Sequence, residues 1–255
     1  TPSNSSAASD VYKRQVENKG QWAMIFNESV KNDSNPVDKT EKFMFDGERL
    51  IQHIIKQRYF EEEISNEVNL SYSDNQVTVT TDYLTLVYTL NSEGYASQCV
   101  YSLSSQNRIY QFSYSAEGYL TGIVENIDNT EYSSTSLTYE NGDITSISSK
   151  MNGLENKFIY EPGEESSTYH LPCLGLLEIH PLTFHIEALY AGLLGKDPRH
   201  FTIRSCPAGS NDEKTIYSYE FDKKGNPSRM ICQTTYAGGQ ASYYPYTRNI
   251  SVSFE

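Results

Sequence analysis

The sequence predicts an all-β protein: a long antiparallel meander of hairpins that forms an open or incomplete barrel or curved sheet, with one helical insert near residues 181–194. Two observations predict the meander. A hairpin pattern repeats along the chain, and its strands alternate apolar and polar residues. A third observation is the composition, because 21 Tyr residues stand against a single Trp. Tyrosine favours strands that pack a ring on one face and keep a hydroxyl for water.

The repeated hairpin is marked by a glycine in its turn. The copies place this glycine at Gly94, Gly118, Gly142 and Gly225, and a weaker copy begins at Phe43. Asn, Asp and Gly in such turns supply the positive φ angles that tight hairpins require. With two strands in each copy, roughly six copies predict about ten to fourteen strands. A meander of this length curls or packs on itself, because open edges and a bare apolar face are costly.

The insert has the only helical pattern in the chain. Pro181 suits a first helical turn, Gly195 suits a C-terminal cap, and Pro198 prevents continuation. An aliphatic stripe on one face consists of Leu182, Ile186, Leu189, Leu193 and Leu194. We expect this stripe to dock inside the curl of the sheet, where it hides apolar surface that the strands leave uncovered. The aromatic residues expected opposite it are Phe112, Tyr114 and Tyr139.

The chain divides into three predicted parts. Residues 5–15 resemble a translated sequencing-library adaptor, so we expect residues 1–15 to form a tail outside the fold. Residues 16–42 are predicted to be a partly ordered N-terminal segment. Residues 43–255 are predicted to form a single β-meander domain, with the helical insert across 171–206. If the adaptor replaces the natural start, an export signal or a lipid anchor belongs to the missing N-terminus.

The charge excludes two kinds of partner. The formal net charge is −13, and the acidic residues are spread along the chain. Nucleic acid requires a basic footprint, and anionic lipid surfaces attract clustered Lys and Arg. No apolar stretch reaches the roughly 20 residues of a membrane-spanning helix. We therefore expect no nucleic acid partner and no transmembrane helix.

Two resemblances rest on short motifs. Phe221-Asp222, followed by Gly225, is similar to the YD repeats of bacterial secreted shell-forming proteins. The segment 190–196, Tyr-Ala-Gly-Leu-Leu-Gly-Lys, set among tyrosine hairpins, resembles a family of uncharacterised exported proteins, often lipoproteins, of gut-type Gram-negative bacteria with a porin-like fold. This second resemblance runs from about Phe43 to the C-terminus. It implies an incomplete barrel outside the cytoplasm, in the periplasm or on the cell surface, and it offers no catalytic residues.

The titratable residues predict no cofactor and no metal site. Four of the five histidines fall in the insert region, but His180 and His185 are not spaced as a zinc-binding pair on one helix face. We interpret the histidines as structural or surface residues. Cys173 and Cys206 flank the predicted helix, and they either stay free or close a disulfide in an oxidising compartment. Cys99 and Cys232 align with aliphatic hairpin positions and are predicted to be small buried residues.

The candidate ligand or partner surface is Tyr243, Tyr244 and Tyr246, which precede the last predicted strand. Exposed tyrosines beside Pro can stack on sugar rings, whereas the alternative is an aromatic seam at a sheet edge.

The function predicted from the sequence is a non-catalytic, extracytoplasmic binding or structural protein of a bacterial envelope. Its partner would be a glycan, a small molecule or an envelope protein. The alternative is a carbohydrate-active hydrolase that uses a pair of carboxylates.

Overall fold

The computed structural model describes residues 20–31, 37–59, 62–103, 106–166, 171, 174–210, 212–223, 225–235 and 246–255. Residues 1–15 lie outside this set, so the predicted tail stays a prediction. The strands are β1 (Gln21–Lys31), β2 (Val37–Asp46), β3 (Arg49–Tyr59), β4 (Glu62–Tyr72), β5 (Gln76–Thr80), β6 (Thr85–Leu90), β7 (Ala96–Leu103), β8 (Gln106–Tyr114), β9 (Leu120–Ile127), β10 (Thr130–Glu140), β11 (Asp143–Met151), β12 (Leu154–Ser166), β13 (His200–Pro207), β14 (Lys214–Phe221), β15 (Pro227–Thr235) and β16 (Tyr246–Phe254).

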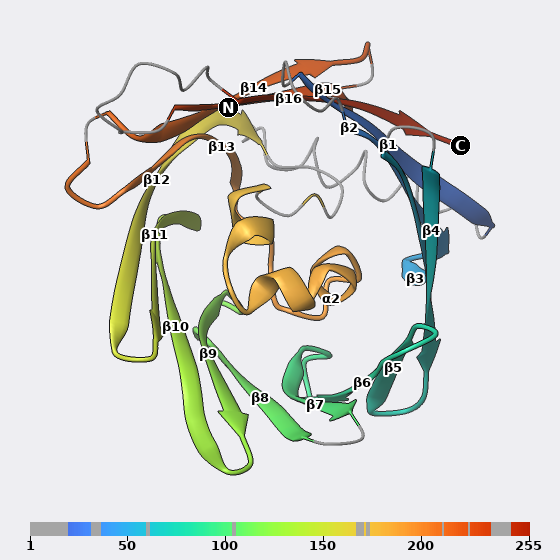
Figure 1. Ribbon diagram of the computed structural model, residues 1–255, viewed down its shortest axis with the longest axis vertical. Helices are drawn as coiled ribbons and strands as arrows, with labels where there is room; N and C mark the ends of the chain where they lie inside the picture. Colours follow the sequence, from blue (N-terminus) through green and yellow to red (C-terminus); the bar gives the residue numbers. More distant parts are fainter. Residues whose placement is uncertain are drawn as a thin grey trace, which may run out of the picture.

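These 16 strands form a closed antiparallel barrel in which sequence neighbours pair and β1 closes the ring against β16 (Figure 1). The prediction of an open or incomplete barrel is therefore wrong, and the expected strand number is too low. Closure depends on β1, in which Met24 pairs with Phe254 and Val30 pairs with Arg248. This strand lies before Phe43, outside the segment whose hairpin repeats predict the sheet. Joining the first and last strands leaves no open edge, which accounts for closure in physical terms.

The turn glycines are where the sequence predicts them. Gly94, Gly118, Gly142 and Gly225 all have positive φ angles, between 84° and 92°. Because antiparallel strands alternate in direction, these four turns lie at the same end of the barrel, which we call the turn end. The turns between β7 and β8 and between β9 and β10 lie at the opposite end, which we call the mouth.

The barrel wall is apolar inside and polar outside. Along β10, Thr135 and Leu137 are buried, whereas Ser136 and Thr138 point the other way and are exposed. Within the described part of the chain, the exposed large hydrophobic residues are Ile64, Tyr83, Met151, Leu154, Phe184 and Ile203. Membrane-spanning β-barrels show the reverse arrangement, an apolar outer band around a polar lumen. The outer wall, where the structure describes it, is thus predominantly polar.

The insert between β12 and β13 is not the single helix predicted over 181–194. It contains the 3-10 turns η1 (Leu174–Glu178) and η2 (Leu182–Phe184) and the short helix α2 (Ile186–Tyr190). No helix in the described residues is long and apolar enough to cross a membrane. The start of the insert also bonds to the wall: the hydroxyls of Thr135 and Ser149 donate to the carbonyl oxygen of His180, at 3.1 and 3.3 Å. Gly192, with a φ of +68°, follows the end of α2.

The prediction that the insert docks inside the curl is confirmed, and Figure 1 shows it in the middle of the ring. The side chains of Leu182, Leu189, Leu193 and Leu194 are buried, and Ile186 packs against the same core. Phe112 and Tyr114 face the insert as expected, with Phe112 beside the ring of His185 and the Tyr114 hydroxyl 3.4 Å from the Leu193 carbonyl oxygen. The insert and the inner side of the wall therefore form the apolar core of the barrel together.

The end of the insert is joined to the turn end by backbone hydrogen bonds. The amide of Ala96 donates to the carbonyl of Leu193 at 2.7 Å. The amide of Lys196 donates to the carbonyl of Gly118 at 2.9 Å, and that of Arg199 to Gly142 at 3.0 Å. These bonds connect the insert to three successive hairpin turns and cover that end.

Candidate functional site

A group of polar side chains, which we call the mouth cluster, lies inside the wall near the mouth. Its members are Arg108 on β8, Tyr110 on β8, Glu125 on β9, Ser133 on β10 and His180 between η1 and η2. The strand register brings them together, because Tyr110 pairs with Glu125 and Glu125 pairs with Ser133. Period-two alternation places Arg108 on the same face of β8 as Tyr110. The cluster thus joins three adjacent strands to the insert.

Glu125 is the centre of the mouth cluster, and its side chain is fully buried. One carboxylate oxygen, Oε2, accepts hydrogen bonds from Ser133 Oγ at 2.7 Å and from His180 Nε2 at 2.6 Å. The other oxygen lies 3.2 Å from a guanidinium nitrogen of Arg108. Burial opposes the charged form, but the hydrogen bonds from His180 and Ser133 and the charge of Arg108 outweigh it and lower the pKa of Glu125. The carboxylate is held as an anion.

Aromatic rings surround the exposed side of the cluster. The guanidinium carbon of Arg108 lies 5.7 Å from the ring centroid of Tyr101 and 5.9 Å from that of Tyr132, within cation–π range. Tyr132 stands at a register irregularity between Glu131 and Ser133, the kind of bulge that redirects a side chain. The ring of His180 meets Phe184 edge to face at 5.6 Å, and Phe184 is 45% exposed.

Three buried polar atoms beside this site have no hydrogen-bond partner among the described residues. They are the hydroxyl of Tyr110, Oε1 of Glu125 and Nε2 of His185. His185 lies behind the cluster, where its Nδ1 is 2.7 Å from the Tyr88 hydroxyl. Burial lowers the pKa of His185 to about 3, so this imidazole is neutral. Oε1 of Glu125 is nevertheless balanced by the guanidinium of Arg108 at 3.2 Å, so the Tyr110 hydroxyl and Nε2 of His185 are the atoms of this group without a hydrogen bond or an ion pair among the described residues.

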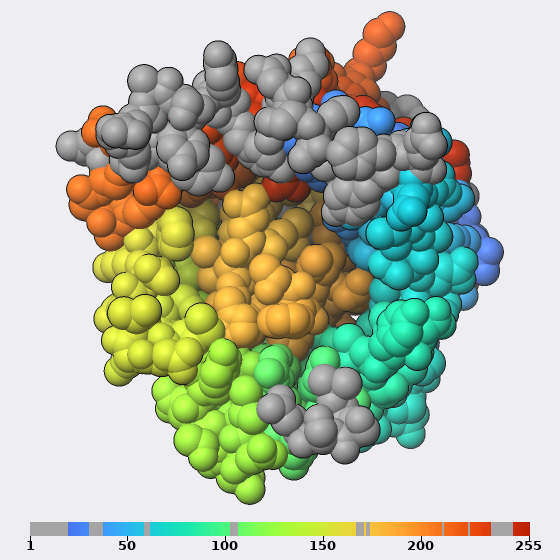
Figure 2. Space-filling view, viewed as in Figure 1, coloured from blue at the N-terminus to red at the C-terminus, as the bar shows by residue number. Residues whose placement is uncertain are grey.

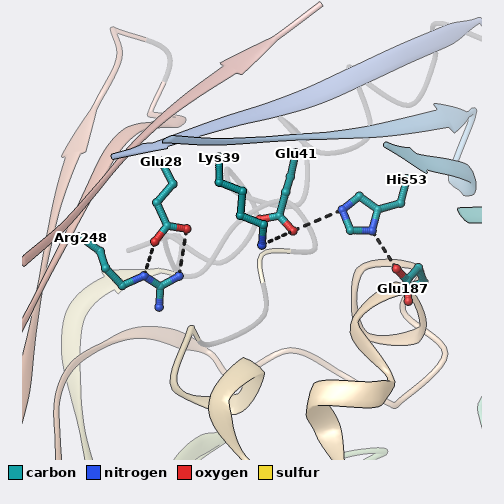
Figure 3. Close-up of polar contacts among 6 residues, drawn as sticks. All are labelled: Glu28, Lys39, Glu41, His53, Glu187 and Arg248. Carbon is teal, nitrogen blue, oxygen red and sulfur yellow. Dashed lines mark hydrogen bonds and ion pairs between the residues drawn. The ribbon is translucent and has the colours of Figure 1, made fainter. Parts of the chain in front are cut away.

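A second charged group, on the other side of the insert, joins α2 to the wall (Figure 3). We call it the latch; it contains Lys39, Glu41, His53 and Glu187. The imidazole Nδ1 of His53 is 2.8 Å from Glu187, its Nε2 is 3.4 Å from Glu41, and Lys39 is 2.9 Å from Glu41. Burial opposes a charge on His53, but its two carboxylate partners outweigh this and raise its pKa. The same contacts, together with Lys39, outweigh burial at Glu41 and lower its pKa to about 2.

A third contact with the wall holds η1. Arg248 on β16 donates to both carboxylate oxygens of Glu28, at 2.5 and 3.2 Å (Figure 3). A further nitrogen of Arg248 donates to Glu178 at 2.6 Å. The bidentate pair fixes the guanidinium against β1, and Glu178 attaches the insert to it. The insert is thus held by ionic contacts on at least two sides of the lumen.

The structure brings together residues other than those predicted as the ligand surface. Tyr243 and Tyr244 lie outside the described residues, and Tyr246 begins β16, where its backbone pairs with Thr234. That surface remains a prediction. In the part of the chain that the structure covers, no group of three or more His, Cys, Asp or Glu residues is placed to hold a metal ion.

The cysteines are buried where the structure describes them. Cys99 and Cys232 are buried, as the hairpin alignment predicts, and Cys206 is also buried. Cys173 lies outside the described residues, so its pairing stays a prediction. The described histidines, His53, His180, His185 and His200, all take part in polar contacts inside the barrel.

The sequence does indicate the mouth cluster, through charged residues at inward-facing strand positions. A search for catalytic motifs does not detect this pattern. In β8, Arg108 shares the period-two spacing of Tyr110, Phe112 and Tyr114, so a charge occupies an inward position next to aromatic rings. Glu125 similarly follows the buried Ile123 at the inward spacing. A charged residue on the apolar face of a strand needs a partner, and this indicates a polar site inside the barrel. The role of His180 depends on the path of the insert, which the strand pattern does not predict.

The fold and the site define a closed β-barrel with a polar exterior whose interior is filled by a segment of its own chain. The chain belongs to the family described as a domain of unknown function (DUF4595) with porin-like fold, whose model matches residues 43–229. This confirms the predicted resemblance to a porin-like family. The resemblances to YD repeats and to an adaptor stay predictions.

Solved structures support the same fold. A porin-like protein from Bacteroides uniformis ATCC 8492 is 26% identical, with 91% of this chain and 96% of that chain covered and a TM-score of 0.82. A porin-like protein from Bacteroides vulgatus ATCC 8482 is 11% identical, with coverage of 89% and 96% and a TM-score of 0.54. At this lower identity the likeness concerns the fold alone. No curated protein matches the chain.

Proposed function

We propose that the protein is a non-catalytic binding protein that works outside the cytoplasm of a Gram-negative bacterium, and that its ligand site is the mouth cluster. The observation that carries this proposal is the arrangement of Arg108 and His180. Both are partly exposed, at 21% and 26%, and both are fixed from behind by the buried carboxylate of Glu125. Polar side chains held in one orientation beside aromatic rings are typical of a pre-formed ligand site.

Passage through the barrel is the function that its fold name suggests, and the interior argues against it. Figure 2 shows the insert filling the centre of the ring. Glu187 and Glu178 bind the insert to the wall through His53 and Arg248. A channel needs a water-filled lumen and an apolar outer band, whereas this barrel has an interior filled by the insert and a polar outside. These features support binding at the mouth, with the barrel as a rigid scaffold.

The proposed location rests on relatives. The family has a porin-like fold, and the Bacteroides uniformis protein is alike over most of both chains. Both support a role in the bacterial envelope, in the periplasm or on the cell surface, where a lipid anchor would hold the barrel close to a membrane. A water-facing outer wall is compatible with such an anchor because the barrel itself need not enter the bilayer.

A hydrolase is the second candidate, because two carboxylates, Glu41 and Glu187, converge on the imidazole of His53. Glycoside hydrolysis requires one carboxyl group that keeps its proton near neutral pH, which means a raised pKa. The pKa of Glu41 is instead lowered to about 2, and Glu41 and Glu187 are already engaged with His53. This geometry is more typical of an ionic contact that holds the insert in place than of a catalytic acid–base pair.

A thermal-shift screen tests the proposal. The wild type, Arg108→Ala and the control Arg229→Ala would be screened against neutral and acidic oligosaccharides, peptides and small carboxylic acids. Arg229 is an exposed arginine on β15 that pairs with Glu220. We expect at least one compound to raise the melting temperature of the wild type and of Arg229→Ala but not of Arg108→Ala.

Two results would overturn the proposal. In the first, every compound that stabilises the wild type raises the melting temperature of Arg108→Ala by the same amount. This would place the ligand elsewhere. The other is time-dependent release of reducing ends from an oligosaccharide, abolished by Glu41→Gln or Glu187→Gln, which would establish the hydrolase. Arg108→Lys keeps a charge beside Glu125, so it separates loss of binding from loss of folding if Arg108→Ala is unstable.

A further inference from the structure

The chemistry of the mouth cluster restricts the class of ligand it can take. Its partly exposed members are a guanidinium, Arg108, and an imidazole, His180; the exposed ring beside them is Phe184. Guanidinium and imidazole groups are planar and present hydrogen-bonding atoms along an edge. Phe184, on the 3-10 turn η2 that follows His180, adds an apolar ring 5.6 Å from the imidazole ring. A matching ligand has hydroxyl groups on its rim and an apolar patch on its face.

The charges of the cluster argue against an ionic ligand. The positive charge of Arg108 is balanced by the Glu125 carboxylate at 3.2 Å, and the same carboxylate binds His180. An anionic ligand would compete with Glu125 for Arg108 and would approach a protein with a formal net charge of −13. A cationic ligand would be repelled by the positive charge of Arg108. An uncharged ligand meets neither penalty.

The layer behind the exposed groups keeps them in position. Ser133 and His180 occupy one oxygen of Glu125, and the ring of Tyr110 packs edge to face against the ring of His185 at 4.4 Å. Tyr101 and Tyr132 flank the guanidinium of Arg108 and restrict its rotation. Side chains that are fixed before binding lose less conformational entropy when a ligand arrives. Glu125 would therefore act as a positioning residue, and Arg108, His180 and Phe184 are the groups left to contact a ligand.

We propose that the mouth cluster binds an uncharged sugar unit, with one face of the ring against Phe184 and its hydroxyl groups bonded to Arg108 and His180. A pyranose ring has an apolar face of C–H groups and a rim of hydroxyls that both donate and accept hydrogen bonds, which matches the two kinds of group present. This assignment rests on the proposed binding function and adds the ligand class to it.

A glycan array tests the ligand class. It compares the wild type with two variants that each truncate one exposed apolar residue, Phe184→Ala at the site and Ile203→Ala as the control. Phe184 lies beside the cluster and is 45% exposed, whereas Ile203 lies on β13 and is 42% exposed. Neither truncation removes a buried side chain, so both variants should fold. The array would carry neutral oligosaccharides of glucose, mannose, galactose, arabinose and N-acetylglucosamine, and also sialylated and uronate-containing chains. We expect binding to at least one neutral glycan, weakened about tenfold or more in Phe184→Ala and unchanged in Ile203→Ala.

The contrary outcomes separate the two proposals. Binding only to sialylated or uronate glycans would overturn the assignment of an uncharged sugar. If no glycan binds while a peptide or small acid stabilises the wild type but not Arg108→Ala, the sugar class is wrong and the binding function stands. If no compound of any class depends on Arg108, both proposals fail. Equal weakening in Phe184→Ala and Ile203→Ala would also contradict the assignment, because it would place the sugar away from η2.

Discussion

The imidazole Nδ1 of His53 lies 2.8 Å from a carboxylate oxygen of Glu187, and this contact joins β3 to α2 across the barrel interior (Figure 3). It shows that the insert is bound to the wall by specific polar contacts as well as by apolar packing. Phe43 stacks on the same imidazole at 4.0 Å and Tyr190 stacks on Phe43 at 3.9 Å, so the latch is built into the aromatic core. Its removal should therefore be measurable as a loss of stability.

Glu187→Gln should destabilise the protein in a pH-dependent way. The raised pKa of His53 means that its charged form stabilises the fold. That contribution is complete below the ordinary value of 6.5 and is lost as the pH rises through the raised value. We expect the variant to lose about 1–3 kcal/mol of unfolding free energy at acidic pH and less in alkaline solution. Urea unfolding at several pH values measures this, with the exposed Glu67→Gln as control. An equal loss at every pH would contradict the role of His53.

Leu189→Asp should unfold the protein. The Leu189 side chain is 8% exposed and packs in the core formed by the insert and the wall. Burying an unpaired carboxylate there costs several kcal/mol, a large fraction of the stability of a typical domain. Circular dichroism on heating reports the outcome, and Thr183→Asp, on an exposed position of η2, is the control. A Leu189→Asp variant as stable as the wild type would mean that the helix does not lie inside the barrel.

Gly195→Ala should lower the free energy of unfolding more than Gly209→Ala, although both glycines have a similar positive φ angle. Gly195 has a φ of +91°, and a Cβ atom there would lie 2.6 Å from the carbonyl oxygen of Gly118. Gly209 has a φ of +81° with nothing within 4 Å of the added carbon. We expect Gly209→Ala to cost about 1 kcal/mol from strain alone and Gly195→Ala distinctly more. Denaturant unfolding measures both; equal losses would show that the insert does not approach the turn end this closely.

The described cysteines should be unreactive in the folded protein. Cys99, Cys206 and Cys232 are buried, and burial raises the pKa of Cys99 to about 12. The thiolate is the reactive form, so both access and ionisation oppose modification. In a Cys173→Ser variant, we expect a thiol reagent to react slowly in native buffer and completely in urea. Rapid reaction under native conditions would show that the barrel opens readily.

Local features of the fold could be predicted from the sequence. The glycines at 94, 118, 142 and 225 mark real hairpin turns because positive φ is a property of a few adjacent residues. The aliphatic stripe of the insert was also informative, since Leu182 and Leu193 are buried in the core. Alternation and turn chemistry act over short distances, and a single sequence records them directly.

Closure and the site depend on contacts between distant segments. The pairing of Met24 with Phe254 joins the two ends of the chain, and no local pattern encodes it. The predicted helix is interrupted because its own backbone bonds change spacing, with His185 donating to Leu182 but Leu189 to His185, and because Gly192 takes a positive φ angle. The carbonyl oxygens of His180 and Leu193 bond to the wall instead. The partnership of Glu125 with His180 likewise forms only once the insert takes its path through the barrel.

A histidine NMR titration tests the ligand site at the mouth most directly. His180 belongs to the mouth cluster, whereas His200 lies at the turn end with its Nδ1 2.8 Å from Asp143. His180→Gln and His200→Gln variants assign the two imidazole signals. On titration with a compound that raises the melting temperature, we expect the His180 signal to shift until saturation while the His200 signal stays in place. A saturable shift of His200 with His180 unchanged would put the ligand at the other end of the barrel and contradict this account.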